Sequence, residues 1–68
     1  MKITLNNNLE NFESASQLTV SKLLIKKNFV FKMLIVKIND NIIKKDEYDQ
    51  TIINDGDSVM VIHLISGG

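Results

Sequence analysis

The sequence predicts an α+β domain in which a mixed sheet of about four to five strands packs on one helix. Two observations carry this prediction: apolar residues alternate with polar ones at both ends of the chain, and a single stretch between them has helical spacing. Clusters of Asn, Asp and Gly separate these segments. With 68 residues, the chain has room for one small domain that buries roughly 60% of its unfolded surface.

The N-terminal segment has the pattern of a strand with one buried face. Met1, Ile3 and Leu5 alternate with polar residues, which is the period of a half-buried strand. Residues 6–8 are all Asn, and because Asn tolerates left-handed backbone they predict a tight hairpin turn. Residues 9–14 then form the returning strand.

One helix is expected from about residue 20 onward. Val20, Leu23 and Leu24 share an apolar face at helical spacing. Thr19 precedes them as a suitable N-cap, and Asn28 can end the helix in a left-handed conformation.

A second strand pair is expected in the middle of the chain. Residues 33–39 are apolar on both faces, which is typical of an internal strand that is covered on its outer side as well. Residues 39–41 supply a turn, and residues 42–43 form a short partner strand.

The last third of the chain contains a charged loop, a turn and the final strand. Residues 44–50 read as a loop with one helical turn, held down by Tyr48. Residues 54–57, Asn-Asp-Gly-Asp, are the strongest turn signal in the sequence, since Gly56 accepts positive φ. The final strand is expected over residues 58–64.

The order of elements predicts the topology. A hairpin followed by a helical crossover places the first and last strands side by side and parallel in the centre of the sheet. This arrangement is the β-grasp fold. We expect residues 1–64 to form the domain and residues 65–68 to form a flexible C-terminal tail ending in Gly-Gly.

Composition excludes several classes of function. Without Cys there is no thiolate nucleophile, disulfide or zinc–thiolate site. Eight basic and eight acidic residues give zero net charge, so neither nucleic acid nor a membrane is an expected partner. The longest apolar run, residues 33–36, is too short to span a bilayer, and a soluble cytoplasmic protein is the default.

Neither catalysis nor metal binding is expected of this chain. His63, the single histidine, lies on the last strand and reads as a solvated or interface residue. The acidic residues of 46–57 read as turn formers on a solvated face, so no metal site is expected.

An apolar stripe is expected on the outer side of the sheet. If Val59 and Val61 point into the core, then Met60, Ile62 and Leu64 point outward, beside Ile35 on the neighbouring strand. Four adjacent exposed apolar side chains on so small a domain predict a docking surface for another protein.

The C-terminal residues Ile65, Ser66, Gly67 and Gly68 are the remaining candidate site. Glycine loses the most entropy on ordering, so Gly-Gly after an apolar strand does not serve a core. Lacking Cβ atoms, the two glycines can thread a narrow channel, and four extended residues reach about 13 Å. They would deliver an α-carboxylate that is ionised at neutral pH and therefore a poor electrophile until another enzyme activates it.

The sequence resembles the ubiquitin-like sulfur-carrier family, and most closely its thiamin-biosynthesis branch. The resemblance rests on the opening strand, the Leu18-Thr19-Val20 helix entry, the Asp55-Gly56-Asp57 turn and the Ile65-Ser66-Gly67-Gly68 ending, and it covers essentially the whole chain.

The resemblance implies a function and a set of partners. A ubiquitin-activating-like adenylating enzyme of the ThiF type would use ATP to convert the Gly68 carboxylate into an acyl-adenylate. A persulfide donor would supply sulfur to give a Gly68 thiocarboxylate, which a ThiG-type thiazole synthase would consume. The chain itself would bind no cofactor and would be a protein substrate rather than an enzyme.

Three alternatives stay open at this point. A molybdopterin-synthase small subunit uses the same terminal thiocarboxylate, a ubiquitin-like modifier would join Gly68 to target lysines, and a non-covalent β-grasp binding module would need no tail chemistry.

Overall fold

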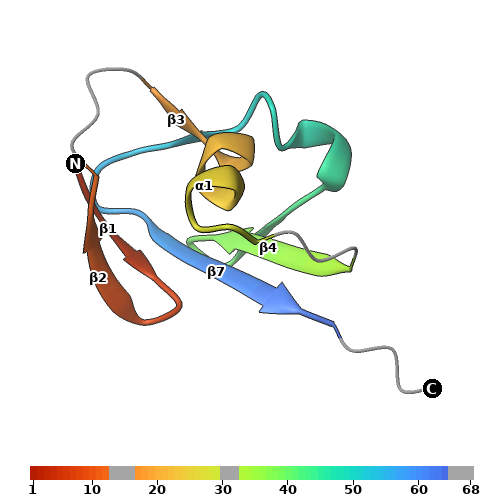
Figure 1. The fold of residues 1–68 in the computed structure, drawn as a ribbon, viewed down its shortest axis with the longest axis horizontal. Coiled ribbons are helices and arrows are strands. Elements are labelled where there is room, and N and C mark those ends of the chain that lie inside the picture. The colour runs from red at the N-terminus through yellow and green to blue at the C-terminus, as the bar shows by residue number, and fades with distance from the viewer. Residues whose placement is uncertain (13–16, 30–32, 65–68) are drawn as a thin grey trace.

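The structure is a computed structural model, and it describes residues 1–12, 17–29 and 33–64. Five strands form one sheet in the order β2-β1-β7-β4-β5, and two short strands, β3 and β6, form a second pair. A seven-residue helix, α1, packs over the sheet, as Figure 1 shows. The mixed five-stranded sheet with one α-helix confirms the predicted β-grasp fold.

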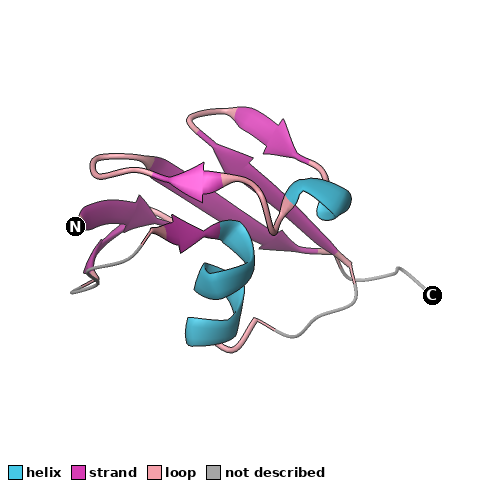
Figure 2. Cartoon of the chain, turned by 90° about the horizontal axis from the view of Figure 1, so that it is seen from above, coloured by secondary structure: helices cyan, strands magenta, loops and turns pink. Residues whose placement is uncertain are grey.

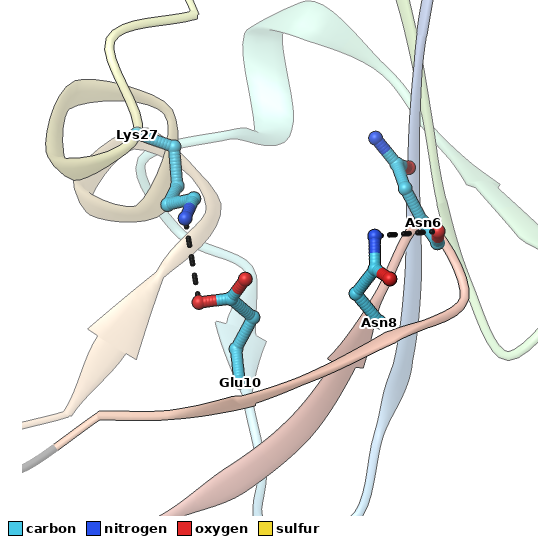
Figure 3. Close-up of polar contacts among 4 residues, drawn as sticks. All are labelled: Asn6, Asn8, Glu10 and Lys27. Carbon is cyan, nitrogen blue, oxygen red and sulfur yellow. Dashed lines mark hydrogen bonds and ion pairs between the residues drawn. The ribbon is translucent and has the colours of Figure 1, made fainter.

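Strands β1 (Lys2–Leu5) and β2 (Asn8–Asn11) form the expected N-terminal hairpin. The turn consists of Asn6 and Asn7, whose φ angles of 49° and 68° are both left-handed. The side chain of Asn8 reaches back to donate to the Asn6 carbonyl, as Figure 3 shows. The returning strand begins one residue earlier than predicted and ends at Asn11, because a two-residue turn already pairs Asn8 with Leu5; residues 13–14 lie outside the described part.

Helix α1 (Val20–Lys26) begins and ends where the sequence predicted. The Thr19 hydroxyl caps it by accepting from the Lys22 backbone N–H at 3.2 Å. Asn28, with φ 58°, ends the helical stretch in the left-handed region. Lys27 then reaches Glu10 of β2 in an ion pair of 3.3 Å, so the helix end is tied to the hairpin (Figure 3).

Strand β7 (Ser58–His63) lies in the middle of the sheet. It pairs parallel with β1 and antiparallel with β4 (Leu34–Ile38), which confirms the predicted pairing of the terminal strands. The ladder of β7 stops one residue short of the predicted Leu64, although the Leu64 N–H still donates to the Met33 carbonyl at 2.9 Å. Strand β5 (Asn41–Ile43) completes the sheet after a second left-handed turn at Asn39 and Asp40.

The connection from β5 to β7 contains two small elements. The expected helical turn is the 3-10 helix η1 (Lys45–Glu47). The sequence did not predict that β6 (Ile52–Ile53) would pair with β3 (Leu18–Thr19), directly before the helix. Two-residue strands are too short to show a period, and it is burial of Leu18 and Ile53 that holds them together.

The core lies between α1 and one face of the sheet. Its fully buried members come from every layer: Ile3, Leu18, Val20, Leu23, Val36, Ile53 and Val59. Figure 2, seen from above, shows the helix in front of the strands. No side-chain N or O atom in the described residues is buried without a hydrogen-bond partner. The helix therefore covers one face of the sheet and leaves the other face available.

Candidate functional site: the outer face of the sheet

The face of the sheet that points away from α1 is defined by strand register. Val59 and Val61 of β7 and Ile3 and Leu5 of β1 are buried against the helix. Because side chains alternate along a strand, Met60 and Ile62 point to the opposite side. We call this side the outer face.

The structure brings the predicted docking residues together on the outer face. Ile35 of β4 is the direct cross-strand neighbour of Ile62. Met60 and Ile35 are half-buried, whereas Ile62 and Leu64 are 36% and 39% exposed. Leu64 follows on the same side of the strand, held by its backbone bond to Met33. The four side chains therefore form one contiguous apolar stripe at the end of β7.

Two further exposed apolar residues lie on the outer face, one on each edge strand of the sheet. Leu9 of β2 pairs with Thr4, and Ile42 of β5 pairs with Lys37, so both lie on the outer face. They are 73% and 65% exposed. The sequence did not indicate them, because turns expected over residues 6–8 and 39–41 leave the register of both hairpins open.

Strand β7, which contributes Met60 and Ile62 to the outer face, is followed in sequence by the C-terminal residues. Ile65, Ser66, Gly67 and Gly68, the predicted threading and sulfur-carrying residues, lie outside the described part of the chain. The last described residue, Leu64, belongs to the apolar stripe. The candidate docking residues and the segment proposed to enter a partner are therefore contiguous in sequence.

Three of the acidic residues that might suggest a cation site, Asp49, Asp55 and Asp57, make hydrogen bonds within the fold. Asp55 accepts from the Lys2 N–H at 2.6 Å, and Asp57 accepts from the Asn39 amide and from the Asn54 N–H. Asp49 bonds the Ser21 hydroxyl. In the described residues no group of three or more His, Cys, Asp or Glu is arranged to hold a metal ion.

His63 and Tyr48 are the other two side chains that the sequence singled out. His63 lies exposed at the end of β7, opposite Leu34. Burial raises the pKa of the half-buried Tyr48 above its ordinary value.

Within residues 1–12, 17–29 and 33–64 there is no pocket, and no helix there is long and apolar enough to cross a membrane.

Fold and outer face together define a small ubiquitin-like β-grasp protein. Comparison with known proteins then identifies the family: the sequence model of the ThiS family matches residues 3–68, and the chain belongs to that family. At the family level this makes it a sulfur carrier of thiamin biosynthesis rather than a catalyst.

Solved structures agree with the assignment. The chain is similar to the crystal structure of the thiamine biosynthesis protein ThiS from Geobacter metallireducens, with 26% identity, complete coverage of both chains and a TM-score of 0.87. A solution NMR structure of a thiamine biosynthesis protein from the same organism gives 27% identity and a TM-score of 0.78, covering all of this chain and 88% of that one. No curated protein matches the sequence significantly.

Proposed function

We propose that this protein carries sulfur as a thiocarboxylate on Gly68 and delivers it to a thiazole synthase. The observation that carries the proposal is the family match, which extends through Gly67 and Gly68. The continuous apolar stripe that ends at Leu64 supports it, because a partner that docks there lies next to the residues it must act on.

The chemistry requires three steps, and a partner enzyme performs the first of them. A carboxylate oxygen of Gly68 attacks the α-phosphorus of ATP, pyrophosphate leaves, and an acyl-adenylate forms on the adenylating enzyme. The terminal sulfur of a persulfide donor then attacks the acyl carbon and displaces AMP. A thiol cleaves the resulting S–S bond, which leaves the thiocarboxylate on Gly68 and the two thiol sulfurs joined as a disulfide.

The partners follow from these steps. The adenylating enzyme is of the ThiF type, the consumer of the thiocarboxylate is of the ThiG type, and ATP is bound by the partner alone. Since ATP and persulfide donors are needed, the proposed site of action is the cytoplasm. Docking on the partner uses Ile35, Met60, Ile62 and Leu64, while Ile65, Ser66 and Gly67 thread the tail into the active site.

Intact-mass spectrometry of the purified chain tests the proposal. After incubation with the adenylating enzyme from the same genome, ATP and a persulfide donor, the mass should rise by the replacement of one oxygen with sulfur. A chain lacking Gly68 serves as the matched control and should keep its mass.

Other outcomes would favour other functions. Larger conjugates joined to lysines would indicate a protein modifier. A thiocarboxylate that molybdopterin synthase consumes and thiazole synthase does not would indicate the molybdopterin branch. A chain that still supports thiamin synthesis without Gly68 would refute the carrier chemistry altogether.

A further inference from the structure

The charges on the sheet are distributed unequally between its two faces. On the outer face the register places two charged residues, Lys2 of β1 and Lys37 of β4, and both are basic. The only acidic residue in the described strands of the sheet, Glu10, lies on the helix side and is paired with Lys27. Although the chain has zero net charge, the outer side of its described strands therefore carries basic and apolar side chains and no acidic one.

Lys37 lies on β4, between the central strand β7 and the edge strand β5. Its direct cross-strand neighbours are Met60 on β7 and Ile42 on β5, and Ile35 precedes it on the same side of β4. The residue is half-buried, so its aliphatic stem packs among these apolar side chains while the ammonium group needs water or a counter-charge. Among the described residues, the ion pair joins Lys27 to Glu10, and the Lys37 ammonium forms none.

The consequence for binding follows from desolvation. A partner that covers the outer face removes water from the Lys37 ammonium, and an unpaired ammonium in an interface is costly. The cost is offset if the partner places a carboxylate there. The strands of a second copy paired through the same face could not supply it, because the outer side of the described strands carries no Asp or Glu.

We propose that Lys37 is a specificity-determining residue of the outer face, and that the adenylating enzyme presents an apolar surface with an Asp or Glu carboxylate opposite it. The inference rests on the proposed function and adds the chemistry of the partner surface. Lys37 sets the register of docking, whereas the apolar stripe supplies most of the buried area.

Steady-state kinetics of carrier-dependent ATP–pyrophosphate exchange tests the assignment. The adenylating enzyme from the same genome is used, and the KM for the carrier is compared between wild type, Lys37→Arg, Lys37→Met and Lys37→Glu. We expect Lys37→Glu to raise KM about tenfold or more with kcat unchanged, Lys37→Met to raise it less, and Lys37→Arg to stay near wild type. Added salt should shrink the differences.

The matched control is Lys26→Glu, which makes the same change in net charge on the exposed side of α1. It should leave KM near the wild-type value, and thermal unfolding of each variant establishes that it is folded. Equal KM values for Lys37→Glu and wild type, equal effects of Lys37→Glu and Lys26→Glu, or a wild-type dimer in sedimentation velocity that buries the outer face would each overturn the assignment.

Failure of the proposed function looks different from failure of this inference. If the wild-type chain supports no exchange, the carrier role fails and the assignment of Lys37 falls with it. If wild type supports exchange and Lys37→Glu does so equally well, the carrier role stands and only the role of Lys37 is refuted.

Discussion

Introducing the same lysine at two consecutive positions of β7 gives a direct test of which face of the sheet is buried. Val61 points toward α1 and is 7% exposed, whereas Ile62 points outward, opposite Ile35, and is 36% exposed. If this register is right, Val61→Lys and Ile62→Lys should differ greatly in stability although they are neighbours in the chain.

The expected magnitudes follow from burial. At position 62 about two thirds of the side chain is buried, so the lost apolar burial is worth about 1–2 kcal/mol, part of which the lysine stem recovers. Val61→Lys loses about 2 kcal/mol of burial and places an ammonium in the core, for a total of at least about 4 kcal/mol. A domain of this length is stable by about 3–10 kcal/mol, so Val61→Lys should be largely or wholly unfolded.

Thermal and urea unfolding followed by circular dichroism measure both variants. For Ile62→Lys we expect a melting temperature within about 8 °C of wild type, together with a raised KM in carrier-dependent pyrophosphate exchange. Similar losses in both variants, or a larger loss in Ile62→Lys, would falsify the register, since a shift of one residue exchanges the two faces.

Three substitutions probe the turns, and one titration probes the half-buried phenol of Tyr48. Asn6→Gly keeps the left-handed turn but removes the side-chain oxygen that accepts from the Val61 N–H at 2.8 Å, so urea unfolding should show a loss of about 1–2 kcal/mol; an unchanged midpoint would mean that water replaces the oxygen. Asp40→Gly relieves the left-handed backbone of residue 40, at φ 70°, and should stabilise the chain by about 0.5–1 kcal/mol. Asn39→Gly should instead destabilise the chain, because the Asn39 side chain makes two hydrogen bonds. A lower urea midpoint for Asp40→Gly would count against the strain argument. Burial raises the pKa of Tyr48 in the folded state above its ordinary value of 10.0. The stability that the neutral phenol contributes is therefore complete below pH 10 and is lost as pH rises through the folded pKa. Tyrosinate absorbance should appear at higher pH in the native chain than in the chain in urea, and coincident titrations would contradict the burial of Tyr48.

The sequence predicted the parts of the fold that depend on local pattern. The alternation of apolar and polar residues in β1 and β7 predicted which side chains enter the core, because successive side chains of a strand point to opposite faces of the sheet. The Thr19 cap and the Asn28 terminus predicted the limits of α1, since both act through the nearest backbone groups. The helical crossover then left few topologies to choose from.

Features that depend on contacts between distant segments were not predicted. The pairing of β3 with β6 joins residues that are more than thirty positions apart, and two-residue strands carry no periodic signal. The exposed apolar residues of the outer face were predicted only in part. Leu9 and Ile42 reach this face through the register of two hairpins, which depends on both turns containing two residues.

The central position of β7 has a consequence for synthesis in the cell. The hairpin of β1 and β2 and the pair of β4 and β5 are joined into one sheet by β7, and β7 is the last of the described strands in chain order. A nascent chain therefore cannot complete its sheet until translation has passed His63. We expect chains that stop before β7 to remain unfolded and open to proteolysis, which would favour copies translated as far as the residues on which the proposed chemistry depends.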